Sequence, residues 1–468
     1  MKYTLCASFA AFLFCGGLAA ETVETFPYTI YDLVEVYTRE EVKEMAKELT
    51  FDGVSNPGVN TSTLDGKVIV GYQGWFNTPE DGSHLYWKHY RSEKKADYDL
   101  FRPGASSIDY WPDMSELDED EKFRTGFRKP DGSPAYVFSS RNPKTVARHF
   151  KWMKDYGIHA AAIQRFNHEL WESPTITANR NVVLSNCRAA ANEHGRGYII
   201  MYDLSSMLHE GADFLMNDWK MLVDDMGITK NPKDKAYMYH NGKPLVGIWG
   251  VGFRAGKNKR QYTLQDCMRV IDFLKNDPQY GGCSILLGVP SRWREGGYDS
   301  NPDPYAQELY KKADIISPWT VGRYRSPDAA KSHVEDLWAK DLAWCKAHQI
   351  DYLPVAHPGV STGNLADRGG FERTPRLGGK FLWQQYHSGS ELGVTMVYQA
   401  MFDEMDEGTQ IFKVDNNPPA GMSRFTTYGD LPSDHYLWLV GQAAARLEKN
   451  LPIEAEMPKR DLSAEKTE

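Results

Sequence analysis

The stretch Ala160–Leu204 decides the fold. It begins with the apolar run AAAIQRF (Ala160–Phe166), continues through helical periodicity at Ser185–His194, and ends with a second apolar run, GYIIMYDL (Gly197–Leu204). Runs that are apolar throughout are typical of strands buried on both faces of a parallel sheet. A strand, a helix and a strand in this order predict one βα unit.

The same alternation continues in both directions along the chain. Short β-branched or aromatic runs predict eight strands: Lys67–Trp75, Ala160–Phe166, Gly197–Leu204, Pro244–Gly250, Cys283–Val289, Ala313–Trp319, Asp351–Ala356 and Val394–Phe402. Helices are predicted between them at Pro143–Tyr156, Ser185–His194, Phe214–Met226, Leu264–Asn276, Pro304–Lys312, Ala329–His348 and Gly379–Ser390. This pattern predicts an α/β fold, a single closed (β/α)8 TIM barrel with long βα loops. Asn241-Gly242 adds a hairpin turn before the fourth strand.

The two ends of the chain differ from the barrel. Residues 1–20 contain one Lys, a short apolar run and then small residues, which predicts a cleaved signal peptide and a secreted or periplasmic protein. Cys15 precedes two glycines, so lipoprotein anchoring is the alternative. We expect an N-terminal extension at 21–59, the barrel at 60–455 and a disordered tail at 456–468.

Composition limits the classes of partner. The net charge is −9 and no long basic run is present, so nucleic acid is not expected as a partner. No stretch after residue 20 has 18 consecutive apolar residues, so no integral membrane segment is predicted. The content of 13 Trp and 26 Tyr suits a sugar-binding cleft, since pyranose faces stack on aromatic rings. The pattern leaves the oligomeric state open.

The cysteines argue against a zinc site. Four remain beyond residue 20, and no CxxC spacing occurs among them. They are Cys187, Cys267, Cys283 and Cys345. Disulfides and buried free thiols both fit this pattern.

Polar and aromatic residues follow the predicted strands. Catalytic groups of a (β/α)8 barrel lie at the carboxyl ends of its strands, so these residues are candidate substrate contacts. They are Tyr72, Trp75, Trp87, Arg165, Asp203, Trp249, Trp319, Arg323 and His357. Four of the aromatic residues are expected to act as sugar platforms, and Arg165, Asp203 and His357 as hydroxyl contacts. The long connection 76–147 is expected to form one wall of the cleft.

The sharpest local signal is FDEMDEGTQIFKV (Phe402–Val414), which places four carboxylates directly after the last apolar run. If Glu404 and Glu407 lie one helical turn apart, they face the same way and can serve one glycosidic bond. Two close carboxylates cannot both ionise freely, so one is expected to stay protonated as the acid while the other acts as base. A cluster that braces the loop is the alternative interpretation.

Two other chemistries involve nearby residues. Asp403, Asp406 and Glu407 offer oxygen ligands for a cation, but their spacing fits no EF-hand loop, so neither a metal nor another cofactor is predicted. The VPSRW segment (Val289–Trp293) has the P-S-R part of a sulfatase motif. Because Gly288 stands where the nucleophilic Cys is needed, a sulfatase is excluded.

At these residues the chain resembles glycoside hydrolase family 99, the endo-α-mannosidases, and a neighbouring 71/99-like group of secreted bacterial proteins. The resemblance is carried by EMDEGTQIF (Glu404–Phe412) and by GYQGWFNTPEDGSHLYW (Gly71–Trp87). It implies a retaining hydrolase acting on an α-linked oligo- or polysaccharide through a 1,2-anhydro sugar. It also implies that Glu404 is the base toward the sugar 2-hydroxyl and Glu407 the general acid/base.

The chain departs from the family motif at two points. Met405 and Asp406 replace a Trp-His pair, and Phe412 replaces a final Glu, so the resemblance leaves the sugar and the linkage open. Two alternatives to a retaining hydrolase also stay open: a non-catalytic glycan-binding protein on the same barrel, and an inverting or lyase-type enzyme.

Overall fold

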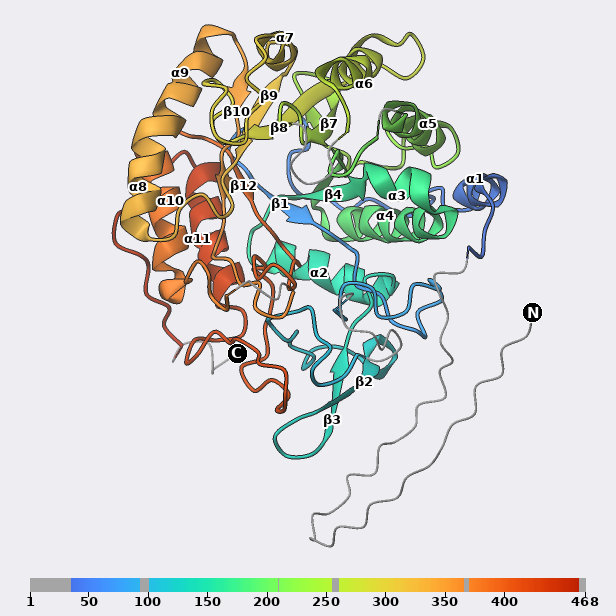
Figure 1. The fold of residues 1–468 in the computed structure, drawn as a ribbon, viewed down its shortest axis with the longest axis vertical. Helices are drawn as coiled ribbons and strands as arrows, with labels where there is room; N and C mark the ends of the chain where they lie inside the picture. Colours follow the sequence, from blue (N-terminus) through green and yellow to red (C-terminus); the bar gives the residue numbers. More distant parts are fainter. Residues whose placement is uncertain (1–34, 93–100, 209, 255–260, 366–369, 463–468) are drawn as a thin grey trace, which may run out of the picture.

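The computed structural model describes residues 35–92, 101–208, 210–254, 261–365 and 370–462. Within these residues the chain forms the predicted (β/α)8 barrel, with helices outside a curved parallel sheet (Figure 1). The predicted signal peptide at 1–20 lies outside the described residues. Among the described residues, no helix is both long and apolar enough to cross a membrane.

All eight predicted strands are present in the described barrel. They are β1 (Val68–Tyr72), β4 (Ala160–Phe166), β5 (Gly197–Asp203), β7 (Lys243–Trp249), β8 (Ser284–Pro290), β9 (Ile315–Trp319), β10 (Asp351–Tyr352) with β11 (Val355–Ala356), and β12 (Val397–Gln399). Neighbours pair in parallel in this order, and β1 pairs with β12, so the two ends of the barrel sequence lie side by side (Figure 1).

The seventh strand closes the ring in two halves. The first half, β10, pairs with β9, and the second half, β11, pairs with β12. Pro354 lies between them and has no N–H to donate, while its carbonyl accepts a hydrogen bond of 2.9 Å from the Tyr398 N–H.

Helices cover the outside of the sheet. The helices that follow successive strands are α2 (Pro143–Asp155), α3 (Asn167–Glu172), α4 (Pro174–His194), α5 (Gly211–Asp224), α6 (Leu264–Asn276), α7 (Tyr305–Tyr310), α8 (Pro327–His333), the π-helical η2 (Val334–Trp338), α9 (Ala339–Ala347), α10 (Lys380–Glu391) and α11 (His435–Glu448). Local sequence fixes their ends: Ser173 caps α4 before Pro174, and Gly195 ends it in the left-handed conformation. The predicted helices are confirmed, whereas α3 and α11 were not predicted.

Smaller elements surround the barrel. The Asn241-Gly242 turn joins β6 (Tyr239–His240) to β7 as predicted, with both residues at positive φ. The connection between β1 and α2 contains the 3₁₀ turn η1 (Glu119–Glu121) and an unpredicted hairpin of β2 (Phe123–Arg128) and β3 (Pro134–Val137), and η3 (Leu377–Gly379) precedes α10.

The barrel strands carry two apolar layers with alternating residues. Ile69, Ala162 and Met201 belong to the cluster inside the barrel, together with Leu286 and Ile315. The intervening residues of the same strands pack against the helices. Successive side chains of a strand point to opposite faces, so each position at a strand end faces either the lumen or a helix.

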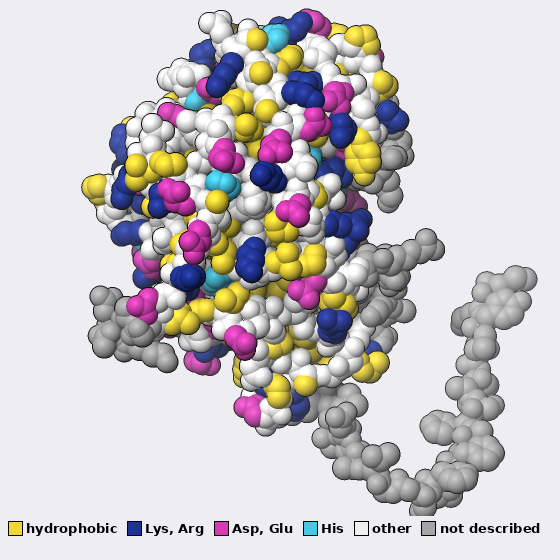
Figure 2. All heavy atoms as spheres, turned by 90° about the vertical axis from the view of Figure 1, so that its left-hand side faces the viewer, with side chains coloured by type: hydrophobic (Ala, Val, Ile, Leu, Met, Phe, Trp, Pro, Cys, Tyr) yellow, Lys and Arg dark blue, Asp and Glu magenta, His cyan; other side chains and the backbone are white. Residues whose placement is uncertain are grey.

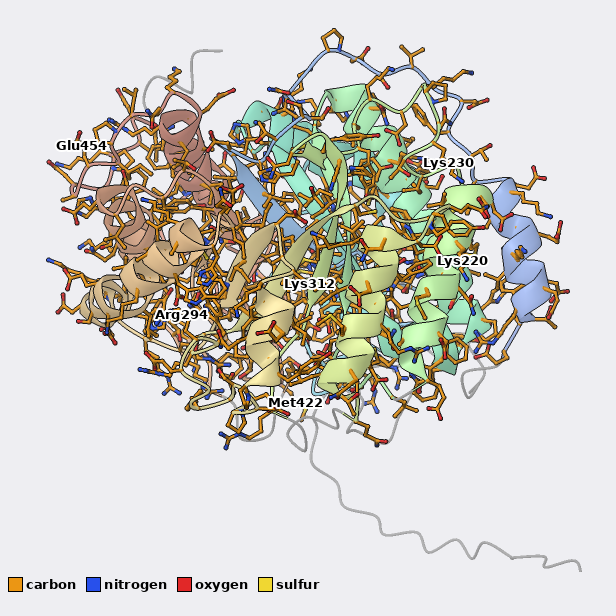
Figure 3. All side chains as sticks on the ribbon, turned by 90° about the horizontal axis from the view of Figure 1, so that it is seen from above. Lys220, Lys230, Arg294, Lys312, Met422 and Glu454 are labelled. Atoms are coloured by element: carbon orange, nitrogen blue, oxygen red, sulfur yellow. The ribbon has the colours of Figure 1, made fainter. Side chains whose placement is uncertain are left out.

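Both chain ends pack on the outside of the barrel. The helix α1 (Arg39–Lys47) lies at the outer edge beside α5, which carries Lys220 (Figure 3), and Arg39 donates a hydrogen bond of 2.7 Å to the Leu170 carbonyl. At the other end, Arg460 pairs with Asp434 at 2.6 Å. This ion pair holds part of the predicted tail against the N-terminal end of α11.

Two general features of the surface and core complete the fold. The face formed by α8 to α11 mixes acidic and basic side chains without separating them (Figure 2). All four cysteines beyond residue 20 are buried free thiols, which settles the choice between disulfides and thiols within the described residues.

Candidate active site

A tight turn after β12 carries the four acidic residues. The Thr409 N–H donates to the Glu404 carbonyl at 3.1 Å, and Gly408 has a φ of +65° that favours glycine. The chain is a turn here and not the helical turn expected from the spacing. Neighbouring loops hold it, because the Met405 carbonyl accepts from the Asp109 N–H at 3.2 Å and the Glu407 carbonyl from the Ser361 N–H at 2.9 Å.

Asp403 joins the last strand to the first. Its two carboxylate oxygens accept the backbone N–H groups of Gln73 and Gly74 at 2.8 and 2.9 Å. Its side chain is fully buried, and burial raises its pKa to about 7 although these N–H groups oppose the change. Asp403 thus fixes the carboxylate turn to the end of β1.

Glu404 is the buried member of the candidate catalytic pair. The Gln73 side-chain amide donates to one carboxylate oxygen at 2.6 Å, and the Thr409 hydroxyl donates to the other. These two donors favour the charged form. Burial, followed by the charges of Glu407 and Asp406, outweighs them and raises the pKa of Glu404 well above its ordinary value.

Glu407 is the solvent-exposed member of the pair. Its pKa is raised to about 7, first by partial loss of water around the carboxyl and then by the Asp406 and Asp203 carboxylates, while Arg373 opposes the change. Solvent at this exposed side chain screens these effects without reversing them. The charge of Glu407 also raises the pKa of Glu404, so the two carboxyl groups titrate as a pair.

Asp406 lies between the two glutamates and contacts a histidine from the connection after β1. Its Oδ2 is 3.0 Å from His89 Nδ1, and burial raises the pKa of Asp406 to about 7. The His89 ring stacks on Trp75 with ring centres 3.9 Å apart. This contact was not predicted, because nothing in the sequence pairs residue 89 with residue 406.

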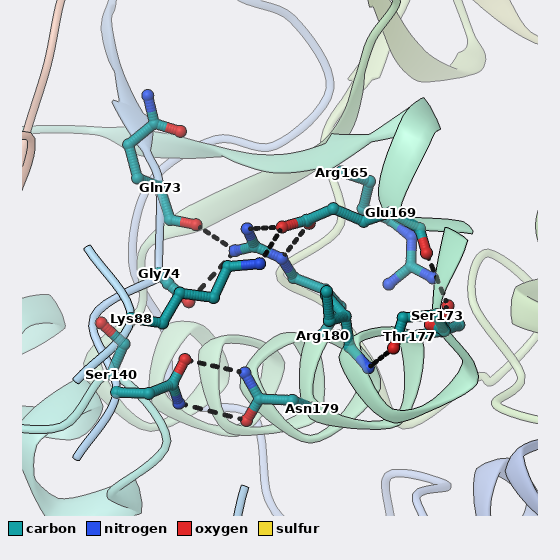
Figure 4. A network of polar contacts seen from close by, with 12 residues as sticks. Gln73, Gly74, Lys88, Ser140, Arg165, Glu169, Ser173, Thr177, Asn179 and Arg180 are labelled. Atoms are coloured by element: carbon teal, nitrogen blue, oxygen red, sulfur yellow. Dashed lines mark hydrogen bonds and ion pairs between the residues drawn. The ribbon is translucent and has the colours of Figure 1, made fainter. Parts of the chain in front are cut away.

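A buried ion network supports Gln73 from behind (Figure 4). Arg180 on α4 donates to the Gln73 and Gly74 carbonyls at 2.8 and 3.2 Å. Glu169 binds Arg180 through both carboxylate oxygens, at 2.6 and 3.0 Å, and also contacts the Lys88 ammonium at 3.1 Å. The network therefore holds the residue that donates to Glu404, and two-pronged Arg–carboxylate geometry makes it rigid.

Three of the predicted substrate contacts face the lumen. Asp203 lies in register with the inward residues of β5 and its charge raises the pKa of Glu407. Trp249 and Trp319 are half-buried against the inner apolar cluster, with their rings 5.4 Å apart and edge to face. These residues offer an acceptor and two aromatic surfaces on the side of the barrel opposite β1.

Two predicted contacts face the helices instead of the lumen. Tyr72 is fully buried, and its hydroxyl lies 2.9 Å from His149 Nδ1 on α2. Arg165 is 1% exposed and pairs with Asp218 on α5, with one hydrogen bond of 2.9 Å. Both predicted sugar contacts are wrong because successive side chains of a strand alternate between the lumen and the helices, and these two lie on the outer face.

Four further predicted substrate contacts pack against or pair with neighbouring side chains of the protein. Trp87 is 4% exposed and packs on Tyr90 and Phe101 within the connection after β1. His357 is fully buried against Tyr324, and burial lowers its pKa to about 3. Neither Trp87 nor His357 is therefore positioned for the predicted contact with a sugar.

The side chains of Trp75 and Arg323 are also engaged by other residues of the protein. Trp75 has His89 on one ring and Phe166 stacked at 5.3 Å, so its faces do not form an open platform. Arg323 forms an ion pair with Asp299 and lies 5.2 Å from the centre of the Tyr298 ring. Trp75 and Arg323 therefore have structural roles, and the predicted sugar contacts are wrong for both.

A cavity of about 590 Å³ is lined by residues that follow β1, β4 and β5, among them His89, His168 and Ser206. His89, which contacts Asp406, is part of its wall, whereas residues 403–407 themselves do not line it. A cavity of about 500 Å³ between α1 and α5 lies outside the barrel, away from the carboxylates. No group of three or more possible metal ligands occurs among the described residues.

The fold and the site together define a (β/α)8 barrel with paired carboxylates after its last strand. The chain is similar to the GH99 endo-alpha-mannosidase from Bacteroides thetaiotaomicron, with a TM-score of 0.57 and 16% identity over 83% of this chain and 99% of that chain. The structure of a GH99 endo-alpha-mannosidase from that organism in complex with BIS-TRIS-propane gives a TM-score of 0.54 at the same identity and coverage. At this identity the likeness shows the fold. No family model and no curated protein matches the sequence.

Proposed function

We propose that this protein is a secreted retaining glycoside hydrolase that cleaves an α-linked glycan or polysaccharide. The observation that carries the proposal is the pair Glu404 and Glu407, which lie on one turn after β12 and both have a raised pKa. A similar fold in an endo-alpha-mannosidase supports the reaction class.

In the proposed reaction Glu404 takes the proton of the sugar 2-hydroxyl, and that oxygen attacks the anomeric carbon. The bond to the leaving oxygen breaks as Glu407 donates its proton there, giving a 1,2-anhydro sugar. Glu407 then takes a proton from water, whose oxygen opens the anhydro ring at the anomeric carbon, and Glu404 returns its proton to the 2-oxygen. The net change is addition of one water with retention of configuration.

The hydrogen bonds to Glu404 favour its ionised form, whereas its burial and the nearby charges favour its protonated form. The Gln73 and Thr409 donors suit an ionised base, whereas burial raises the pKa of Glu404 and opposes ionisation. The proposed roles therefore require that Glu404 is ionised and Glu407 is protonated when the sugar is bound.

Glycosides with an activated leaving group test these roles. An α-glycosyl fluoride needs no acid to leave, so Glu407→Gln should keep most of the rate of the first fluoride release while losing about 10³-fold in turnover of an ordinary glycan. Glu404→Gln should lose turnover on both substrates. The reverse pattern would exchange the two roles, and binding without turnover by the unmodified protein on all α-linked glycans would favour the glycan-binding alternative.

A further inference from the structure

Arg376, just before η3, is a buried cation that contacts the carboxylate turn. The residue is 4% exposed, and its Nη2 donates to the Gly408 and Gln410 carbonyls at 2.9 and 2.7 Å. Three tyrosine rings surround the guanidinium, with their centres 4.6 to 5.2 Å from its carbon: Tyr110, Tyr428 and Tyr436. The carbonyls and the ring faces together offset the cost of burying this charge.

The carbonyl groups of the turn are held one after another. Ser361, which follows β11 as Arg376 does, donates its N–H to the Glu407 carbonyl at 2.9 Å. The Thr409 carbonyl accepts the Met401 N–H at 3.0 Å. Together with the two hydrogen bonds of Arg376, these contacts hold every carbonyl from residue 407 to residue 410. Arg376 thus holds the peptide groups on both sides of Thr409.

Thr409 connects these contacts to the candidate base. Its N–H donates to the Glu404 carbonyl at 3.1 Å, and its hydroxyl donates to a Glu404 carboxylate oxygen. Such a hydrogen bond depends on the position and direction of the hydroxyl, and hence on the backbone that carries it. Gly408 gives this backbone more freedom than another residue would, so the turn needs contacts from outside.

We propose that Arg376 is a positioning residue for Glu404, on which it acts by keeping the Thr409 hydroxyl in place. The inference rests on the proposed function, in which Glu404 takes the proton of the sugar 2-hydroxyl. A donor held in this way stabilises the ionised carboxylate that the reaction needs. A weaker hold should therefore lower kcat and leave KM nearly unchanged, because Arg376 bonds to the turn and not to the sugar.

A double-mutant cycle tests whether Arg376 acts through Thr409. Arg376→Lys keeps the charge, but its ammonium falls one bond short of the carbonyls. We expect it to lower kcat about tenfold, as should Thr409→Val, which removes the hydroxyl. The double variant should be no slower than Thr409→Val alone, because the group that Arg376 positions is then absent. Multiplied losses, about 100-fold in the double variant, would overturn the proposal.

The pKa of Glu404 gives a readout that needs no turnover. It can be followed by NMR of isotopically labelled glutamate, with the signal assigned from Glu404→Gln. Thr409→Val removes a donor from the ionised carboxylate and should raise this pKa, and Arg376→Lys should change it in the same direction. The charges of Glu407 and Asp406, which also act on Glu404, are present in every variant. An unchanged pKa in Arg376→Lys would overturn the proposal, even if the protein cleaved no glycan.

Arg188 on α4 provides the matched control. It is fully buried and also donates to two backbone carbonyls, those of Met226, at 2.7 Å, and Leu49. Arg188→Lys should lower the Tm about as much as Arg376→Lys, with kcat and the pKa of Glu404 unchanged. An equal loss of kcat in Arg188→Lys would mean that Arg376 contributes only general stability, and the proposal would be wrong.

Discussion

Gln164 and Arg165 are neighbours in β4, yet they lie in different regions of the barrel. Gln164 faces the lumen and donates a hydrogen bond of 2.9 Å to the Tyr398 hydroxyl on β12. Arg165 faces the helices and forms a buried ion pair with Asp218. Polar residues at strand ends therefore serve two purposes here: the inner set forms the site, and the outer set joins sheet to helix.

The largest difference between the two regions is expected in stability. Arg165→Met leaves Asp218 buried without its cation and should lower the free energy of unfolding by about 3–5 kcal/mol. Gln164→Ala, the matched change on the inner face, should cost about 1 kcal/mol. Urea unfolding of both variants checks this. Similar losses would mean that the two faces are not energetically distinct.

A change in the lumen should act on substrate binding. Trp319→Ala removes one of two aromatic surfaces facing the lumen, and we expect KM to rise about tenfold with little change in kcat. Trp344→Ala on α9, where the ring stacks on His348, is the control outside the barrel. If both variants had the same KM, the platform role of Trp319 would be lost.

Asp406→Asn should shift the pH dependence. The pair is active with one proton, so kcat/KM should rise as the first proton leaves, near pH 7, and fall at a higher pH as the second leaves. Because the Asp406 charge raises the pKa of both glutamates, its removal should move both limbs to lower pH. A profile that stays in place would show that Asp406 does not act on the pair.

The same variant has a stability readout. The pKa of Asp406 is about 7 in the folded protein, above its ordinary value of 3.8, so the folded state binds more protons between these values and stability falls as pH rises through them. Asp406→Asn should therefore lose less Tm than the unmodified protein between pH 5 and pH 8.

The smallest effect is expected at Tyr72. Tyr72→Phe removes a hydroxyl that contacts His149 in the outer layer and should lower stability by about 1 kcal/mol without changing KM. The free energy of unfolding and the KM, measured on one preparation, distinguish a structural role of Tyr72 from a sugar contact. A raised KM with unchanged stability would indicate that Tyr72 contacts the sugar, as the sequence predicted.

The sequence was sufficient for the barrel because its strands are long apolar runs. Ala160–Phe166 was predicted with the observed bounds, and even the strand interrupted at Pro354 was recognised. α11 was missed because it follows the last strand, beyond the alternation that identified the others. The hairpin of β2 and β3 was missed because it lies in a polar connection without strong periodicity.

The sequence predicted only those site residues whose place follows from their position at the end of a strand. The acidic turn and the lumen-facing Trp249 follow from position at a strand end. Gln73, Asp403 and His89 needed contacts between distant parts of the chain, which no local pattern encodes. Counting alternate residues back along β1 and β4 is the signal that would have exchanged Tyr72 and Arg165 for Gln73 and Gln164.

The link between Gln73 and Asp403 has a consequence for the newly made chain. The two residues are 330 positions apart and meet only when β1 and β12 pair. Contacts this distant form late, because a long loop must close first. An unfinished or unclosed chain therefore has its acidic residues without their partners, and turnover would begin only once the last strand has taken its place.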